Sequence, residues 1–309
     1  MKLLTFASDA GQHPGILIGD DTVLRLDLAL QKEGFPNISS LLDLIEAGPE
    51  ALAAVRRLEG ASHADQSPDL YVPLSAVRLC APIPRPRKNV FCVGRNYREH
   101  VTEAAKARGK EVKIPEHPQY FTKPPLAVIG PTDDFLWDPE VTQKLDYEVE
   151  LAVVIGKAGR NIPRERALEY VFGYTVVNDI TARELQKRHD QWFKGKGLDG
   201  SCPMGPWIVD AQQIPNPQNV TVSLRVNGEE RQHASTSMMI FDIQELISQL
   251  SQGLTLEPGD VIATGTPSGV GFAMDPPRLL GDGDLVEAEV SGIGKLANRI
   301  RRIEHSVLG

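Results

Sequence analysis

The spacing of apolar and polar positions predicts two unlike parts of the chain. Residues 2–7 (KLLTFA) and 14–27 (PGILIGDDTVLRLD) are typical of short strands around a Gly-Asp-Asp turn, and residues 39–60 predict two short helices. From residue 89 onward, short apolar runs bounded by turn residues predict mainly strands. These strands do not alternate with helices in a βαβ rhythm, so we predict an α+β, mainly β fold rather than a doubly wound sheet.

The predicted elements of the larger part can be named by their ranges. Strands are expected at 89–94, 146–156, 172–180, 205–211, 220–232, 260–266 and 284–300. Helices are expected at 96–109, 162–171, 181–190 and 241–254. The dipeptide Asn227-Gly228 predicts a hairpin with a type I′ turn, because both positions of that turn require a positive φ.

A proline-rich stretch separates the two parts. Pro82, Pro84 and Pro86 alternate within APIPRPRKN, and alternating prolines favour an extended backbone. We therefore expect a small α+β N-terminal domain over residues 1–75, a linker over 76–88, and a large, mainly β domain over 89–309.

Composition narrows the class of protein. The chain of 309 residues carries a net charge of −8 and no long basic run, which argues against nucleic-acid and membrane partners. Its three cysteines, Cys80, Cys92 and Cys202, form no CxxC pair, so a disulfide framework or a zinc-thiolate site is not expected. No window approaches the about 20 apolar residues of a membrane span. We expect a cytoplasmic protein, because no secretion signal is visible at the N-terminus.

One glycine motif is a false lead. Residues 195–200 (GKGLDG) match the dinucleotide fingerprint GxGxxG, which needs a strand before it and a helix after it. The following Ser-Cys-Pro cannot open a helix, so nucleotide binding is not predicted.

Alternating acids point to a metal site. Asp146, Glu148 and Glu150 would share one face of a strand, and the next five residues are apolar on both faces, so the strand enters a core. A buried carboxylate must be neutralised, paired or bound to a metal. Asp179, at the end of another apolar strand, offers a third ligand. Such hard oxygen ligands favour Mg²⁺, Mn²⁺ or Ca²⁺ over zinc.

A histidine and a glutamate form a candidate base. Asn96 and Glu99 have the spacing of a capping box, so a helix would begin there and place His100 and Glu103 on one face. A carboxylate beside an imidazole fixes its tautomer and raises its basicity, as a general base requires. The alternative is an exposed histidine with a chance acidic neighbour.

Further polar residues lie in turn-rich segments and would suit an anionic, oxygen-rich substrate. They are Lys123, Arg183, Gln186, Lys196 and Thr266. Arg183 and Gln186 follow Asp179 by four and seven residues, which predicts one helical stripe. Thr266 lies in ATGTPSG, a turn whose backbone N–H groups could hold a carboxylate.

As a set, these segments resemble the fumarylacetoacetate hydrolase family. The matching segments include GRNYREHVTEA, QYFTKPP, DYEVELAVVIGK, GYTVVNDITARELQ and KGLDGSCPMGPWIV, and they run from about residue 88 to 303. The first 75 or so residues match weakly. The resemblance implies a mixed β-roll for the large domain and a homodimer.

The resemblance also implies roles for individual residues. Glu148, Glu150 and Asp179 would bind Mg²⁺ or Mn²⁺, with Asp146 outside this ligand set as a supporting or solvated group. The implied catalytic residues are His100, Glu103 and Lys196, and the implied substrate-binding residues are Arg95, Tyr97, Lys123, Arg183, Gln186 and Thr266. Gly197 and Leu198 replace the Ser and Phe that often follow the site lysine, which would alter the pocket.

The reaction expected from these parts is metal-dependent hydrolysis. His100, oriented by Glu103, would activate water to cleave a C–C bond of an acylpyruvate-like 1,3-dicarbonyl acid, with an enolate as leaving group. The alternatives on the same site are decarboxylation of a 2-oxo acid such as oxaloacetate and isomerisation of a 2-hydroxy-diene acid. A more distant alternative is a non-catalytic metabolite-binding protein.

Overall fold

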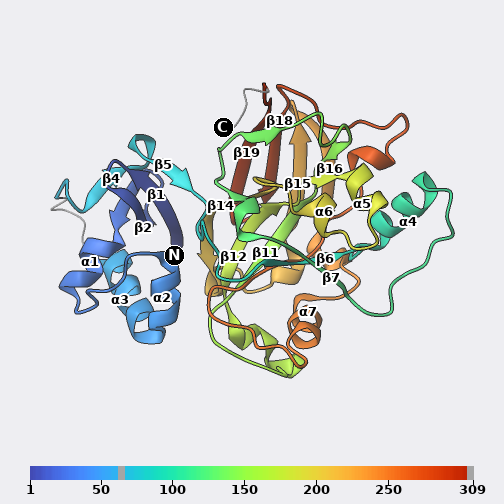
Figure 1. Ribbon diagram of the computed structural model, residues 1–309. Coiled ribbons are helices and arrows are strands. Elements are labelled where there is room, and N and C mark those ends of the chain that lie inside the picture. Colours follow the sequence, from blue (N-terminus) through green and yellow to red (C-terminus); the bar gives the residue numbers. More distant parts are fainter. Residues whose placement is uncertain (62–66, 305–309) are drawn as a thin grey trace.

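The computed structural model describes residues 1–61 and 67–304 of the chain. Figure 1 shows a smaller N-terminal part beside a larger body. The N-terminal part is a meander of β1 (Lys2–Ser8), β2 (Gly11–Ile18), β3 (Thr22–Arg25) and β4 (Tyr71–Pro73) with α1 (Leu26–Lys32), α2 (Leu41–Ala47) and α3 (Pro49–Gly60). The helices at 41–60 were predicted, whereas α1 begins inside a range that was predicted as strand.

One sheet runs through both parts of the chain. Strand β1 pairs with β14 (Cys202–Asp210), with Leu3 opposite Ile208, and with β5 (Arg78–Cys80). The sheet continues through β12 (Val171–Asn178), β11 (Val149–Ile155), β17 (Val261–Ala263), β6 (Val90–Gly94) and β7 (Gln119–Lys123), while β8 (Val128–Ile129) pairs with β14.

The boundary between the two parts is also packed. Leu3 and Ile16 share an apolar core with Ala152 and Val154 of the larger body. Ile83, inside the predicted linker, is buried as well. The segment 76–88 is therefore not a free spacer, and a division into two domains at that point stays a prediction.

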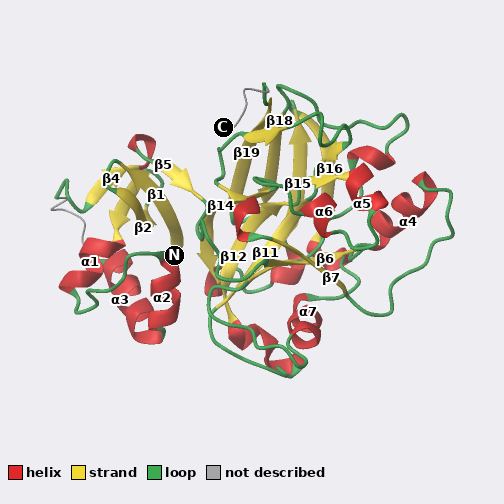
Figure 2. Ribbon diagram, viewed as in Figure 1, coloured by secondary structure: helices red, strands yellow, loops and turns green. Residues whose placement is uncertain are grey.

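A second sheet covers the first and completes the body. It consists of β16 (Glu229–Ser235), β15 (Thr221–Val226), β18 (Leu285–Val290), β19 (Gly294–Arg302) and β9 (Phe135–Trp137) (Figure 2). Its apolar face joins Leu151 and Val153 of β11 in one core. The predicted type I′ hairpin is confirmed, because Asn227 and Gly228 both have positive φ, 51° and 82°. The fold is α+β with more strand than helix, as predicted.

Short elements collect at one end of the sheets and carry the polar residues of interest. They are β10 (Leu145–Asp146), β13 (Thr181–Ala182), α4 (Arg98–Ala107), α5 (Arg183–Arg188) and α6 (Phe193–Lys196), while α7 (Ile243–Leu250) lies lower on the body (Figure 1). The 3₁₀ turns span Leu74–Ala76, Pro125–Ala127, Arg164–Tyr170, Ala211–Gln213, Pro217–Asn219, Thr236–Met238 and Gly271–Ala273.

Three local predictions need correction. Residues 162–171 were predicted as a helix and contain a 3₁₀ turn. Asn96 does not cap α4, because its side-chain amide bonds to the backbone of Phe241 and Thr264, and Tyr97 precedes the helix without a side-chain cap. Asp179 lies before β13, outside the helix that holds Arg183 and Gln186, so the three do not share a helical stripe.

The structure shows the elements around the motif GKGLDG and the lengths of the helices. The motif GKGLDG begins in the last two residues of helix α6 and is followed by strand β14, whereas a dinucleotide-binding motif follows a strand and opens a helix. Within residues 1–61 and 67–304, no helix is long and apolar enough to cross a membrane.

Candidate functional site

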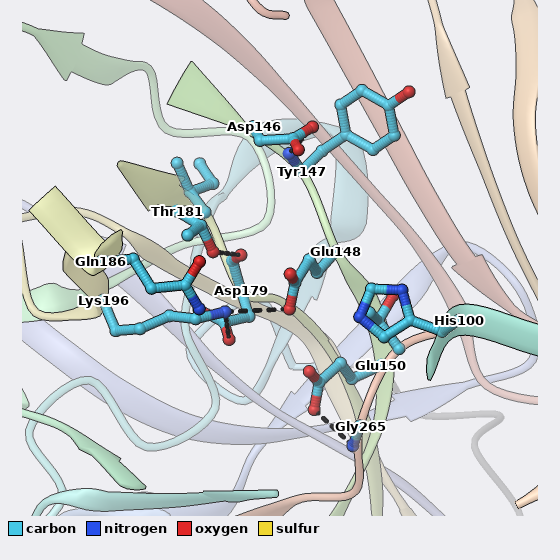
Figure 3. A network of polar contacts seen from close by, with 12 residues as sticks. His100, Asp146, Tyr147, Glu148, Glu150, Asp179, Thr181, Gln186, Lys196 and Gly265 are labelled. Carbon is cyan, nitrogen blue, oxygen red and sulfur yellow. Dashed lines mark hydrogen bonds and ion pairs between the residues drawn. The ribbon is translucent and has the colours of Figure 1, made fainter. Parts of the chain in front are cut away.

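Three buried carboxylates converge where β11 and β12 meet. The antiparallel register places Val149 opposite Asn178, and the Asp179 N–H donates to the Glu148 carbonyl at 2.8 Å. One oxygen each from Glu148, Glu150 and Asp179 lies within 4.8 Å of the others (Figure 3). The predicted continuous strand is interrupted between β10 and β11, so Glu148 precedes β11 and Glu150 lies within it. The predicted convergence is confirmed.

Three buried cations surround these acids. Lys196 Nζ lies 2.9 Å from Glu148 Oε2 and 2.5 Å from Asp179 Oδ2. Lys123 Nζ lies 2.7 Å from Asp179 Oδ1, and Arg183 Nη1 lies 2.7 Å from Glu148 Oε1. Burial raises the pKa of Glu148, but the charges of Lys196 and Arg183 outweigh it and hold that pKa well below its usual range.

Glu150 is the exception among the acids. It accepts a hydrogen bond from the Gly265 N–H at 2.7 Å, and no cation of the described chain forms an ion pair with it. Burial, followed by the charges of Asp179 and Glu148, raises the pKa of Glu150 well above its ordinary value. Glu150 therefore lies where an added positive charge would be most favourable.

The residues fit a divalent cation. The described part of the cluster holds four buried acids, Asp146, Glu148, Glu150 and Asp179, against three buried cations, Lys123, Arg183 and Lys196. A metal ion beside Glu150 would compensate the surplus negative charge. The donors are all carboxylate oxygens, which suit hard ions such as Mg²⁺ or Mn²⁺. The buried acidic triad could hold such an ion.

His100 and Glu103 form a pair on α4. His100 Nδ1 lies 2.9 Å from Glu103 Oε1, and Glu103 Oε2 accepts the Gly269 N–H at 2.9 Å. His100 is buried, so the alternative of an exposed histidine is wrong. With Nδ1 bonded to Glu103, Nε2 is the nitrogen left to exchange protons in the cavity that His100 lines. Its ring stands beside Glu148 and Glu150 in Figure 3.

A glycine-rich loop binds three acids through its backbone. The N–H groups of Gly265, Gly269 and Gly271 donate to Glu150, Glu103 and Asp146 respectively, at 2.7, 2.9 and 2.8 Å. The sequence predicted that these N–H groups could hold a carboxylate. The carboxylates that they hold are the protein's own.

Asp146 lies outside the triad, as expected, and supports it from behind. It is fully buried rather than solvated, and its Oδ2 accepts from Arg183 Nε at 2.8 Å and from the Phe272 N–H at 3.0 Å. It therefore fixes the guanidinium that contacts Glu148. Burial lowers the pKa of Arg183, but Asp146 and Glu148 outweigh this and raise it, so the guanidinium stays charged.

A cavity of about 210 Å³ opens onto Glu148 of the acidic triad and onto His100. Of the predicted residues, it is lined by Arg95, His100, Glu148, Arg183, Gln186, Lys196 and Thr266. Thr266 Oγ1 is fixed there by an N–H of Gln232 at 2.8 Å. Lys196 enters from α6, a short helix that its glycine-rich sequence did not suggest.

Two predicted substrate-binding residues do not line this cavity. Lys123 is fully buried and donates to the carbonyls of Ile180 and Ser201 besides pairing with Asp179, so it positions that carboxylate. Tyr97 is buried, and its hydroxyl has no hydrogen-bond partner among the described residues. Burial, then the charge of Glu150, raises the pKa of Tyr97 and keeps it protonated.

Several cavity residues were not anticipated. Phe121, Trp192, Phe272 and Arg108 line the walls and the mouth. Phe272 follows the glycine-rich loop, and Arg108 follows the last residue of α4. An aromatic or basic residue at such positions carries no sequence signal of its own, because its place depends on tertiary packing.

Comparisons with known proteins identify the family of the chain. Residues 89–301 match the family model described as Fumarylacetoacetate (FAA) hydrolase C-terminal. The oxaloacetate tautomerase YisK of Bacillus subtilis (strain 168) is 50% identical over 292 residues, which is 93% of this chain and 95% of that protein.

Solved structures show the same fold. A fumarylacetoacetate hydrolase from Exiguobacterium antarcticum matches with a TM-score of 0.79 and 41% identity over 98% of this chain and 100% of that one. A maleylpyruvate hydrolase from Sphingobium sp. SYK-6, in complex with manganese(II) ion and pyruvate, matches with a TM-score of 0.74 and 30% identity over 98% and 100% of the two chains. The chain thus belongs to the fumarylacetoacetate hydrolase family.

Proposed function

We propose that this protein is a metal-dependent tautomerase of a short 2-oxo dicarboxylic acid such as oxaloacetate. The observation that carries the proposal is its 50% identity, over 93% of the chain, to a tautomerase of that acid. Among the reactions predicted from the sequence, the oxaloacetate-type and isomerase alternatives are therefore better supported than C–C bond hydrolysis.

The acidic triad places the 2-oxo end of the substrate. Glu148, Glu150 and Asp179 would hold the divalent cation, which would supply Lewis-acid chemistry for the 2-oxo group and its carboxylate. Arg183 Nη2 has no hydrogen-bond partner among the described residues, and Arg183 lines the cavity. A buried guanidinium N–H without an acceptor is a ready donor to a substrate oxygen.

The His100–Glu103 pair moves the proton. The enol and keto forms differ in the position of one proton, which leaves the oxygen on C2 and is added to C3, and no carbon–carbon bond breaks. His100 Nε2 takes and returns this proton while Glu103 holds Nδ1 at 2.9 Å. Lys196, which lines the cavity, adds positive charge where the negative charge of the enolate develops.

The test follows three signals from one protein sample with and without EDTA. Freshly dissolved enol oxaloacetate should lose its ultraviolet absorbance faster with Mg²⁺- or Mn²⁺-loaded protein, and EDTA should abolish the acceleration. Pyruvate, measured with lactate dehydrogenase, should not accumulate. Faster cleavage of an acylpyruvate than enol decay would favour the hydrolase instead, and pyruvate release would favour the decarboxylase.

The variant His100→Gln tests the proton carrier. We expect kcat to fall by roughly 10²- to 10⁴-fold, the usual contribution of a positioned general base, with unchanged metal binding by calorimetry. The matched control is His233→Gln, since His233 also lies beside a glutamate three residues away, at 3.3 Å, but is exposed on β16. Near-normal turnover of the metal-loaded His100→Gln protein would remove this residue from the mechanism.

A further inference from the structure

Arg108, at the mouth of the cavity, is a cation without an anionic partner. It follows the last residue of α4 and lines the same cavity as Glu148 and Lys196. Within the described part of the chain, its guanidinium forms no hydrogen bond or ion pair, although it lies 5.1 Å from the ring centre of Phe272. An exposed arginine without a partner is ordinary, but one that is fixed over an aromatic ring at a cavity mouth is not.

Phe272 gives this arginine a firm support. Its backbone N–H donates to Asp146 at 3.0 Å, and its ring also lies 4.5 Å from the guanidinium of Arg183. The two guanidinium groups thus share one ring. Burial, followed by the charge of Arg183, lowers the pKa of Arg108, and the opposing charge of Glu148 does not offset them. This mutual repulsion would be relieved by an anion bound near them.

The other cations of the cavity differ from Arg108. Arg183 and Lys196 are paired with buried carboxylates, and Arg95 donates to the Lys113 carbonyl. Lys110 also lines the cavity and has no anionic partner within the described residues, but nothing holds its side chain in place. Arg108 is therefore the cation that is both positioned and free to bind an anion.

We propose that Arg108 is a specificity-determining residue that binds the distal carboxylate of a dicarboxylic substrate while the acidic triad receives the 2-oxo end. This inference rests on the proposed function and adds the feature that separates dicarboxylic from monocarboxylic 2-oxo acids. Guanidinium and carboxylate match in geometry, and the stacked guanidinium loses little freedom on binding.

The expected effect is a loss of discrimination. Oxaloacetate is compared with its 4-methyl ester, which keeps the 2-oxo carboxylate end and lacks the distal charge. In Arg108→Gln, KM for oxaloacetate should rise by roughly 10- to 100-fold, the range for a hydrogen bond to a charged group. The kcat for oxaloacetate and both constants for the ester should change little, because the proton transfer machinery is untouched.

Control variants separate a specific contact from a general charge effect. Lys106→Gln removes one charge from the exposed side of the same helix and should behave as wild type. Arg108→Lys should recover part of the affinity for oxaloacetate. Phe272→Leu removes the ring that supports Arg108, and it should raise KM for oxaloacetate by less than Arg108→Gln does. Unfolding temperatures confirm that each variant is folded, and Arg108→Lys and Phe272→Leu carry the test where Arg108→Gln does not fold.

The outcomes distinguish the two proposals. A wild-type protein that accelerates neither substrate contradicts the tautomerase proposal, and the inference on Arg108 falls with it. If the wild type is active and Arg108→Gln still prefers oxaloacetate over the ester to the same degree, the inference on Arg108 is overturned and the tautomerase proposal stands. An equal loss on both substrates, or an equal loss in Lys106→Gln, also overturns it.

Discussion

Two clusters of charged side chains in this molecule pair acids with cations at similar distances. In the N-terminal part, Asp27 lies 2.7 Å from Arg25 and 3.0 Å from His13. In the body, Lys196 lies 2.9 Å from Glu148 and Arg183 lies 2.7 Å from it. The N-terminal side chains are 13–23% exposed, whereas those of the body cluster are 0–7% exposed.

The difference lies in charge balance rather than in geometry. Ser8 Oγ lies 2.9 Å from His13 Nε2, so Ser8, His13 and Asp27 have the spacing of a catalytic triad. Arg25 already neutralises Asp27, which removes the charge that would support a protonated histidine. The body cluster instead leaves Glu150 without a cation. The two clusters are therefore distinguished by the buried acid that lacks a cation, and not by their contact distances.

The largest expected effect comes from the uncompensated acid. Glu150→Gln should lower kcat/KM by roughly 10³-fold or more, because Lewis-acid stabilisation is worth several kcal/mol. Mn²⁺ should raise the unfolding temperature of the wild type and not that of the variant, since an ion that binds the folded state stabilises it. Without metal, the variant should be no less stable than the wild type. The control is Glu289→Gln, at an exposed position of β18.

If Mn²⁺ raises the unfolding temperature of Glu150→Gln as much as that of the wild type, the ion binds elsewhere. Calorimetric titration of Mn²⁺ into both proteins gives this result without an activity measurement. Retained tight binding in Glu150→Gln would contradict the ligand assignment even if turnover were lost.

An intermediate effect is expected from removing one cation in each cluster. Lys123→Met leaves Asp179 buried without that partner, and the free energy of unfolding should fall by about 3–5 kcal/mol. Arg25→Met, in the partly exposed cluster, should cost about 1 kcal/mol or less. Urea unfolding followed by circular dichroism measures both. Equal losses of unfolding free energy in the two variants would show that burial does not make the two clusters energetically different.

The smallest effect is a pH dependence in the N-terminal cluster. Burial raises the pKa of Asp27, but hydrogen bonds to Arg25 and His13 outweigh it and lower that pKa below its ordinary value. A lowered pKa in the folded state stabilises the protein above the ordinary pKa of about 4 and ceases to do so as the pH falls through the lower value. Asp27→Asn should therefore cost up to about 1 kcal/mol at pH 7, and the difference should shrink steadily in more acidic solution. If the stability difference between the wild type and Asp27→Asn grows as the pH falls, the pKa of Asp27 is not lowered in the folded state.

Sequence patterns predicted the acids of the site better than its cations. Glu148, Glu150 and Asp179 could be found because charged residues at the start or end of an apolar strand contrast with their neighbours. Lys196 was singled out only as one of several polar residues in turn-rich segments, and its catalytic role came from the family resemblance, since the helix that presents it has four residues and both of its neighbours are glycines. Local pattern cannot show that its ammonium group bridges two carboxylates.

Other errors have a common cause in tertiary contacts. Asn96 has the local pattern of a helix cap, but partners from residues 241 and 264 compete for its amide. Arg108 gains its place from Phe272, which lies far away along the chain. The strand break before β11 arises where the Glu148 N–H bonds to the Asn178 side chain at 3.0 Å instead of to a neighbouring strand backbone. The spacing of apolar and polar residues along the sequence does not reveal these tertiary contacts.

The glycine-rich loop has a consequence for how this enzyme can diversify. Its contacts to Glu150, Glu103 and Asp146 are made by backbone N–H groups, which no substitution other than proline removes. An insertion or deletion between Gly265 and Gly271, however, would change the spacing of these N–H groups, so that they could no longer all reach their carboxylate acceptors. We therefore expect the length of this loop to be invariant among relatives that share the mechanism, while adaptation to new substrates changes side chains at the cavity mouth.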